Sequence, residues 1–518
     1  MRPLFWIAAA YVLVRVIAYG VDPASTRRYH VEAAWFLLGV IGWVTAAAGG
    51  RGGVAPPAPA GTITSRERLA LFAGLFVITL FCYWPSLGVG LLSDDFSLIQ
   101  RADHWTIFRT AQAEFFRPAP LLLWAIVRRV SHDSLWLHAL NLALHAVNGF
   151  LLAFVALRIG MPRIAAAAGA VLFVTFPAHV EAVTWISGMQ DLAMTCACLT
   201  YVLLTVGEPP GPVRGVAGLI VLAIALLSKE TAVIAPVLGV MLTFLTPAHT
   251  RRESWIWLAA GLALAAAYAV WRISVLPPPA GYDQTLTRYF GKELISRAFG
   301  TLAVPWSASV LRAAPWLAVV SAVFALAVAT AGVLCARLDR GILRRATILL
   351  VWSLVAVVPV YSYFFISPSL QGSRYLYLPA CGWMLFVAGM ATAAASSRPL
   401  WVTYTVWMAM IAAAGTGAAG ARWHQRPWTD AAVLRDRVLT DVKRLGGAMQ
   451  CTAADTEVAD LPDAVDGAYV FRNGFREAVA TVLPAPSSAP LTIVAGQSAR
   501  CRFRWTDRGL VVPSPPGL

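Results

Sequence analysis

The chain has 518 residues, of which 58% are hydrophobic and only 13% are charged, and its formal net charge is +15. Soluble globular domains carry about 25% charged residues, so this composition excludes an ordinary soluble protein and indicates a helical membrane protein. The basic residues stand singly or in pairs at the ends of apolar segments and form no long run, which argues against nucleic-acid binding.

Thirteen apolar segments are predicted to be transmembrane helices. In chain order they are 4–20, 33–49, 69–89, 135–157, 164–178, 191–206, 215–228, 231–246, 255–276, 315–336, 346–366, 375–394 and 400–419. A Gly- and Pro-rich linker, 49–68, follows the first two. We therefore divide the chain into an N-terminal two-helix hairpin with its linker (1–68), a transmembrane domain (69–420) and a small soluble tail (421–518).

The arginines of the short loops set the predicted orientation, because Lys and Arg favour the cytoplasmic side. With the N-terminus inside, the segment 295–311 must be interfacial or re-entrant instead of spanning. The segment 114–134 is too short to span and suits a helix that lies in the interface plane. The predicted outer parts, which we expect to face a bacterial periplasm from the inner membrane, are the loops 90–134, 178–190, 228–230, 277–314 and 367–374 and the tail.

The tail differs in character from the rest of the chain. It contains short alternating runs such as "GAYVFRNGF" and "CRFRWT", which predict a small α+β domain. Cys451 and Cys501 are the only two cysteines in it. An oxidising compartment outside the membrane would permit a disulfide between them.

One predicted span carries a polar stripe. His138, Asn141, His145 and Asn148 follow one another at spacings of 3, 4 and 3 and fall within an arc of roughly 80° on a helix. Such a stripe should face a cavity or other helices instead of lipid. A packed hydrogen-bond seam and a cavity lining both explain it, whereas metal binding by the two histidines is disfavoured because neutral amides fill the intervening places.

Other polar residues gather at the predicted outer ends of the helices. Asp94 and Asp95 stand side by side at the start of the first outer loop. The remaining candidates are Arg117, His179, Glu181, Asp191, Lys229, Glu230, Arg374, Tyr375 and Tyr377. Each of them alone is explained by a helix-end anchor or a local ion pair, but their joint placement on one side favours a functional site.

Six motifs in this order carry a family resemblance. They are "LLSDDFSLI", "FFRPAPLLLW", "LHALNLALHAVN", "FPAHVEAVTWISGMQD", "LSKETAVIAP" and "GSRYLYLP". Over about 69–395 the chain resembles the GT-C membrane glycosyltransferases of the protein O-mannosyltransferase-like branch, in particular the membrane half of those that carry tetratricopeptide repeats. Two features depart from that pattern: Met189 stands where the family commonly has Arg, and the small tail replaces the repeats.

The resemblance implies a GT-C-like all-α fold with about 13 transmembrane helices. It implies transfer of a sugar from a polyprenyl-phosphate donor to an acceptor hydroxyl at the outer face, by a single inverting displacement. Asp94 would act as general base, and Asp95 would orient the acceptor or help to hold a metal. The two residues could also have these roles exchanged. A divalent metal ion is compatible with the motifs but not required by them.

The remaining candidate residues fall into two groups. Lys229 and Arg374, with Tyr375, would hold the donor phosphate, because the leaving anion needs fixed positive charge. The acceptor side or cavity lining would be formed by Arg117, His138, Asn141, His145, His179, Glu181, Asp191 and Glu230. A protein, a lipid and a glycan all stay open as the acceptor.

Two other classes of function compete with this one. A secondary transporter or lipid flippase would suit the many spans, but it would often show internal repeats with charges near the midplane. Here no convincing repeat occurs and the charges gather at one face. A scaffold or sensor protein with the tail as a binding module is the third class, and it should tolerate loss of the Asp pair.

Overall fold

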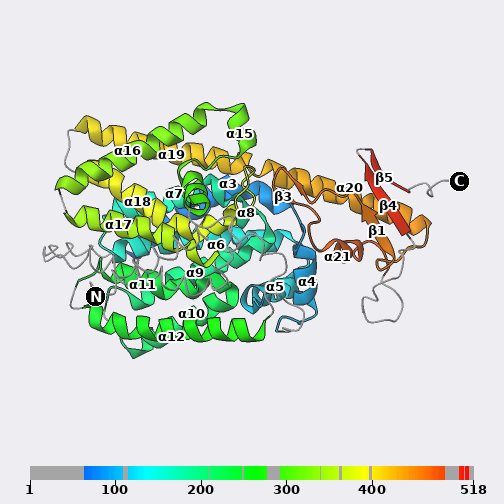
Figure 1. Cartoon of the computed structure of the whole chain (residues 1–518), viewed down its shortest axis with the longest axis horizontal. Coiled ribbons are helices and arrows are strands. Elements are labelled where there is room, and N and C mark those ends of the chain that lie inside the picture. Colours follow the sequence, from blue (N-terminus) through cyan, green and yellow to red (C-terminus); the bar gives the residue numbers. More distant parts are fainter. Residues whose placement is uncertain are drawn as a thin grey trace, which may run out of the picture.

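The computed structural model describes residues 64–108, 115–208, 210–247, 250–276, 292–338, 340–360, 365–395, 400–484, 501–506 and 508–512. The predicted spans at 4–20 and 33–49 lie outside these residues. Figure 1 shows a long helical bundle, from one end of which a single helix projects and carries a small domain with strands.

The bundle is built from α-helices joined by short 3₁₀ turns. In chain order these are α3 (Ser65–Tyr83), η2 (Trp84–Gly88), α4 (Asp95–Asp103), α5 (Pro118–Val130), α6 (Leu135–Arg158), α7 (Arg163–Val174), η3 (Pro177–His179), α8 (Val180–Thr184), η4 (Ile186–Gly188), α9 (Met189–Thr205), α10 (Pro212–Ser228), η5 (Glu230–Ile234), α11 (Ala235–Thr243), α12 (Arg251–Val275), α14 (Lys292–Ala303), α15 (Ala308–Ala313), α16 (Trp316–Leu338), α17 (Arg340–Val355), η7 (Val358–Val360), η8 (Ser373–Leu376), α18 (Tyr377–Ala395) and α19 (Leu400–Trp423).

Local sequence signals fix several of the helix ends. Thr64 and Glu67 form a capping box at the start of α3, in which each side chain bonds the backbone N–H of the other. Proline occupies the first helical position of α5 and α10, where a missing N–H costs no hydrogen bond. Gly160 has a positive φ of 78° just past the end of α6, the usual conformation for a helix terminus.

Of the eleven predicted spans from residue 69 onward, ten lie within the described residues and are mainly helical, and the eleventh, 346–366, is mainly helical over its described part up to Val360. In the part of the chain that the structure describes, seven elements are long and apolar enough to cross a membrane: Ser65–Gly88, Leu135–Arg158, Ile186–Thr205, Arg251–Val275, Gly341–Val360, Ser373–Ala395 and the stretch Leu400–Ala448. The pair Arg163–Val174 and Pro177–Thr184 is bent by 51° and is either a broken span or a re-entrant element. The chain is therefore a multi-span membrane protein, and the total of thirteen helices stays a prediction.

The outer surface of the bundle suits a lipid environment. On α16 the side chains of Val319, Val323 and Leu326 lie along one stripe and are each at least 60% exposed. Similar apolar side chains are exposed on α12 and α19. Water would penalise so much apolar surface, whereas lipid chains would not.

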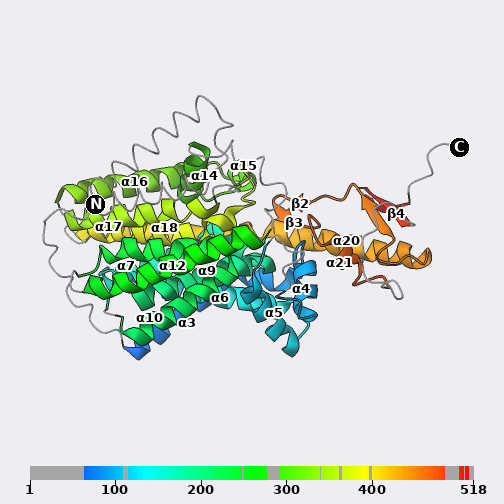
Figure 2. The same ribbon diagram turned by 60° about the horizontal axis from the view of Figure 1, so that its bottom comes forward.

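The described parts of the predicted outer loops 90–134, 178–190, 228–230 and 367–374 meet at one end of the bundle, although they are far apart in the sequence. Figure 2 shows α4 and α5 at the end where the projecting helix leaves the bundle. Arginines gather at the other end: Arg158 and Arg214 both pair with Glu208, and Arg345 donates to the carbonyl of Gly160. Loop arginines such as Arg158 and Arg345 therefore lie at the opposite end of the bundle from the predicted outer loops, as the predicted up-and-down order of the helices requires.

One predicted loop has a different form in the structure, whereas a second segment agrees with its prediction as interfacial or re-entrant. The segment 178–190, expected to be an outer loop, folds into η3, α8 and η4, and every residue from 172 to 189 is buried. Its apolar side chains, such as Val180 and Trp185, pack beneath the tail instead of facing water. The segment 295–311 is divided between α14 and α15, each too short to cross a bilayer.

The tail is an α+β domain built on one long helix. It contains α20 (Arg426–Ala448), β1 (Thr456–Ala459), β2 (Ala464–Val465), β3 (Ala468–Tyr469), α21 (Phe475–Val479), β4 (Cys501–Thr506) and β5 (Gly509–Val511). Strand β4 pairs parallel with β1 and antiparallel with β5, and β2 and β3 form a hairpin. A disulfide joins Cys451, just after α20, to Cys501 at the start of β4.

A hydrophobic core joins the tail to the bundle. Trp428 of α20 and Tyr469 of β3 pack around Trp185, with ring centroids 6.2 and 4.8 Å away, respectively. Val89 and Leu92 of the first outer loop are buried in the same cluster. The tail and the predicted outer end of the bundle are therefore packed together.

Candidate active site

The buried member of the Asp pair is Asp95, the first residue of α4. The backbone N–H of Leu92 donates to its Oδ2 at 2.9 Å, and the backbone N–H and hydroxyl of Ser187 both donate to Oδ1. Burial raises the pKa of Asp95 to about 7, although the hydrogen bonds oppose this shift. Asp95 thus ties the first outer loop to the turn at Ser187, out of reach of a substrate.

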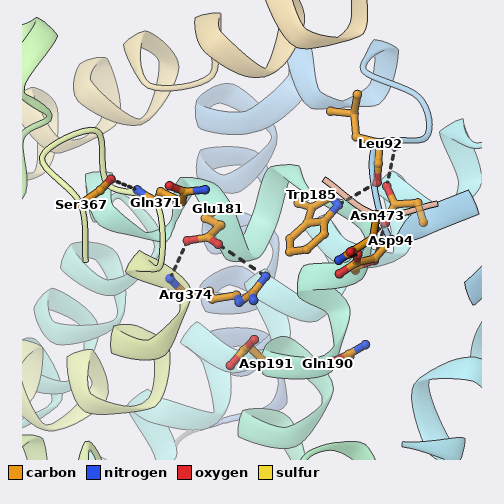
Figure 3. Close-up of polar contacts among 12 residues, drawn as sticks. Leu92, Asp94, Glu181, Trp185, Gln190, Asp191, Ser367, Gln371, Arg374 and Asn473 are labelled. Atoms are coloured by element: carbon orange, nitrogen blue, oxygen red, sulfur yellow. Dashed lines mark hydrogen bonds and ion pairs between the residues drawn. The ribbon is translucent and has the colours of Figure 1, made fainter. Parts of the chain in front are cut away.

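Asp94, in contrast, is partly exposed. Its Oδ1 accepts a hydrogen bond of 2.6 Å from the side-chain amide of Asn473, a residue of the tail (Figure 3). Among the residues that the structure describes, none donates to its other oxygen, Oδ2. Of the two adjacent carboxylates, Asp94 is therefore the one that a molecule in solution can approach.

Three cations from different loops each face a carboxylate at this end of the bundle. The pairs are Arg117 Nε with Glu230 Oε2 at 2.9 Å, Lys229 Nζ with Asp191 Oδ1 at 2.6 Å, and Arg374 Nη1 with Glu181 Oε1 at 3.5 Å. We call these six residues the ion-pair cluster. The cluster is continuous, because Lys229 and Glu230 are neighbours in sequence and Arg117 also contacts Gln190, next to Asp191.

The predicted phosphate-binding residues differ in accessibility. The side chain of Lys229 is only 3% exposed, whereas that of Arg374 is 20% exposed. The ring of Tyr375 lies near both, with its centroid 5.1 Å from Lys229 Nζ and 5.3 Å from the Arg374 guanidinium carbon. The structure thus brings the three residues together but leaves Arg374 more open to a ligand than Lys229.

Trp185 connects the ion-pair cluster to the Asp pair. The guanidinium of Arg374 lies 4.8 Å from the centroid of the Trp185 ring. The indole N–H of Trp185 donates to the carbonyl oxygen of Leu92 at 3.1 Å. Figure 3 shows Trp185 between the Glu181–Arg374 pair and Asp94. The sequence analysis did not single out this residue, although it lies within the "HVEAVTWISGMQD" motif.

The polar stripe of α6 is a buried, hydrogen-bonded seam between helices. His138, Asn141, His145 and Asn148 are all fully buried. His138 Nε2 lies 3.2 Å from the carbonyl oxygen of Gly90, and Asn141 Nδ2 donates to that of Trp185 at 2.9 Å. The stripe therefore supports the backbone of both loops that carry the candidate site.

The two remaining histidines of that region belong to the same buried seam. His145 Nδ1 lies 2.6 Å from the hydroxyl oxygen of Tyr377, and His179 packs against the same tyrosine ring at 4.5 Å. His179 Nδ1 also bonds the carbonyl of Phe173. Over the described part of the chain, no group of three or more His, Cys, Asp or Glu side chains is placed to hold a metal ion.

Met189, which departs from the family pattern, is fully buried. Its sulfur accepts a hydrogen bond of 2.9 Å from the indole N–H of Trp124 on α5. The adjacent Gln190 contacts the cation Arg117. The methionine thus packs α9 against α5, and it contributes no charge to the cluster.

A hollow of about 160 Å³, open to solvent and lined by both polar and apolar side chains, lies where the bundle meets the tail. Its walls include Glu181, Gln371, Arg426, Asp430 and Asp466. Glu181, whose side chain is only 1% exposed, is thus shared between the wall of this hollow and the ion-pair cluster. The hollow offers carboxylate, amide and guanidinium groups to a hydroxyl-bearing molecule.

Two residues of the tail that touch the first outer loop were not predicted. Asn473 contacts Asp94, and Arg435 of α20 donates to the carbonyls of Val89 and Leu91. The "NG" dipeptide at 473–474 signals a turn, but nothing local says what the turn contacts. Arg435 has no feature that separates it from the other arginines of an amphipathic helix.

Comparisons with known proteins give one distant similarity. No protein-family model matches the sequence, and no curated protein matches it. The structure is similar to the crystal structure of the Archaeoglobus fulgidus oligosaccharyltransferase in its apo form, with 12% sequence identity and a TM-score of 0.41. The alignment covers 83% of this chain and 62% of the archaeal chain. This chain therefore spans less than two thirds of the length of the archaeal protein. A TM-score this low establishes neither a common fold nor a common activity.

Proposed function

We propose that the protein is a membrane glycosyltransferase that moves a sugar from a polyprenyl-phosphate donor to an acceptor hydroxyl. The observation that carries the proposal is a reachable carboxylate, Asp94, at the same end of the bundle as a cluster containing three cations. A base for the acceptor and positive charge for a departing phosphate are the two groups that this reaction needs. The six sequence motifs support the same assignment.

The proposed reaction is a single displacement at the anomeric carbon of the sugar. The acceptor oxygen attacks this carbon, Asp94 takes the hydroxyl proton, and the bond between the carbon and the phosphate oxygen breaks. The electrons of that bond leave with the polyprenyl phosphate, and the configuration at the carbon inverts. Asp95 holds the loop through Ser187, so that the base stays in place.

The donor phosphate would be held chiefly by Arg374. Its fork of N–H groups is partly exposed and suits a phosphate better than a point charge does. Lys229 would contribute through its charge beneath Tyr375, with its ammonium fixed by Asp191. The acceptor, which can be a protein, a lipid or a glycan, would approach the exposed side of Asp94. We place this end of the molecule in the periplasm of a bacterial inner membrane.

The proposal is tested with the full-length protein purified in detergent. A panel of polyprenyl-phosphate sugars is offered with hydroxyl acceptors, and release of the lipid phosphate and the configuration of the product are followed. We expect turnover by the wild type and a loss of about 10²- to 10⁴-fold in kcat for Asp94→Asn. Asp133→Asn, the same change at an exposed carboxylate that precedes α6 and accepts from the N–H of Leu135, is the matched control and should keep wild-type turnover.

Arg374→Gln tests the donor side of the same site. Loss of the guanidinium should raise the KM for the donor about tenfold or more while the protein stays folded. Wild-type turnover by Asp94→Asn, or no turnover of any donor by the wild type, would overturn the proposal. In the second case transport of a lipid-linked sugar becomes the leading function, and flipping in vesicles is the assay.

A further inference from the structure

The tail holds the backbone just before the Asp pair. Nη1 of Arg435 on α20 donates to the carbonyl oxygens of Val89 at 2.8 Å and Leu91 at 2.7 Å. Arg435 is only 8% exposed, and its guanidinium lies against Gly90, where a Cβ would come within 2.7 Å of Nη1. Gly90 also has a positive φ of 72°. The shape of this turn and the position of the arginine therefore depend on each other.

The tail also holds the backbone at the Asp pair itself. The N–H of Ser93 donates to the carbonyl of Val470 at 2.9 Å, and the N–H of Asn473 donates to the Ser93 hydroxyl at 3.2 Å. Ser93 has a positive φ of 51°, which is uncommon for serine. Gly474 has a φ of 74° and lies so close that a Cβ would be 2.4 Å from the Ser93 carbonyl oxygen.

The third contact reaches the proposed base. The side-chain amide of Asn473 donates to Oδ1 of Asp94 at 2.6 Å. This bond fixes one carboxylate oxygen, while Oδ2 receives no hydrogen bond from the described residues. An amide is a neutral donor, so it orients the carboxylate without a competing ion pair.

An apolar contact surrounds these polar ones. Leu92 and Phe96 of the first outer loop are buried in one cluster with Tyr469 and Phe471 of the tail. The contacts of Arg435, Val470 and Asn473 are therefore made at the edge of a packed interface, and they are not isolated surface contacts.

We propose that the tail completes the active site. Asn473 is a positioning residue that aims Oδ2 of Asp94 at the acceptor hydroxyl, and Arg435 is a positioning residue for the backbone at 89–91. The inference rests on the proposed function, in which Asp94 is the base. Neither residue touches the reacting atoms, and both act through the carboxylate of Asp94.

The experiment measures kcat and donor KM for full-length wild type, Asn473→Ala, Asn473→Asp and Asn473→Gln. A positioning role predicts a fall in kcat of about 10- to 100-fold for the alanine variant, with donor KM within about twofold. The aspartate variant should fall further, because two carboxylates repel each other. The glutamine variant keeps an amide donor and should recover part of the loss. Arg476→Ala, at an exposed position of α21, is the control.

Hydrogen exchange gives a second readout that does not require turnover. Asn473→Ala and Arg435→Met should both speed amide exchange in the peptide that covers 89–98, since each removes a bond to that loop. Arg476→Ala should leave it unchanged. Thermal unfolding of each variant shows whether the global fold is kept.

The possible results separate this inference from the proposed function. Wild-type kcat in both Asn473→Ala and Asn473→Asp would overturn the positioning role, as would an equal loss in all three Asn473 variants. If the wild type turns over no donor, the proposed function fails by itself. The exchange experiment then still decides whether the tail holds the loop, and unchanged exchange in Arg435→Met and Asn473→Ala would refute it.

Discussion

Asp95 couples the stability of the first outer loop to pH. The folded protein keeps this carboxyl protonated up to about pH 7, whereas the unfolded chain releases the proton near the ordinary pKa of 3.8. Below about pH 4 both states hold the proton, so the free energy of unfolding should fall as pH rises from about 4 to about 7 and then level off. We expect Asp95→Asn to flatten this decline, measured as the melting temperature in detergent from tryptophan fluorescence.

Ser187→Ala provides the complementary test of the same carboxyl. It removes a hydroxyl that donates to Asp95 and opposes the pKa shift. The decline of the melting temperature should therefore extend to higher pH in this variant. An Asp95→Asn protein with the pH dependence of the wild type would contradict the assignment.

The pair formed by Lys229 and Asp191 should contribute strongly to stability because it is buried. The two side chains are 3% and 5% exposed, so Lys229→Met leaves a buried carboxylate without its partner. We expect this variant to lose about 3–5 kcal/mol of unfolding free energy. The double variant with Asp191→Asn should regain a substantial part, which is measured by thermal unfolding in detergent.

The ion pair between Glu67 and Arg163 offers a matched control at the surface. Its side chains are 49% and 47% exposed, and exposed pairs contribute about 0–1 kcal/mol. Glu67→Gln should therefore change the melting temperature little. A similar effect of Glu67→Gln and Lys229→Met would show that burial does not decide the contribution of these pairs.

The short elements η3, α8 and η4 depend on one close crossing of the backbone. A Cβ on Gly188 would lie 2.2 Å from the carbonyl oxygen of Ala182, so Gly188→Ala must displace the turn that places Ser187 against Asp95. We expect a loss of about 1–3 kcal/mol in unfolding free energy and reduced turnover. Gly74→Ala on α3, where no atom lies within 4 Å, is the control and should not destabilise. Equal melting temperatures would contradict this prediction.

The helices were predictable because their apolar segments have the length of a bilayer. Loop arginines such as Arg158 and Arg345 then indicated which ends lie together, and the structure gathers Asp94, Lys229 and Arg374 at the other end. Segment 178–190 was predicted as a short outer loop but is helical and buried, because Glu181 within it and Asp191 just after it resemble surface charges in sequence. Their burial depends on Arg374 and Lys229, whose positions only the packed bundle reveals.

The contribution of the tail could not be predicted from local patterns. Asn473 belongs to a turn signal, and Arg435 belongs to an amphipathic helix, but their partners Asp94 and Val89 are more than 300 residues away. Periodicity describes which face of an element is buried, and it does not identify the surface that covers this face.

The disulfide connects the stability of the tail to the candidate site. Cys451 and Cys501 are separated by 50 residues, and the segment they enclose contains Asn473. In the chain-entropy model, a disulfide that closes a loop of this length raises the free energy of unfolding by about 4 kcal/mol. Cys451→Ser with Cys501→Ser, or reductant added to the wild type, should lower the melting temperature and speed exchange at 89–98. Reductant should have no further effect on the double variant, and an unaffected wild type would contradict the prediction.

The contact between Arg435 and the first outer loop also has a consequence for biogenesis. Arg435 and Val89 are 346 residues apart, and a ribosome adds about 5–20 residues per second, so the loop waits on the order of tens of seconds for its partner. During that interval α3 and α6 have already been synthesised and can meet membrane lipids. Under the proposed function, a newly made chain would therefore lack a complete active site until the tail has reached the first outer loop.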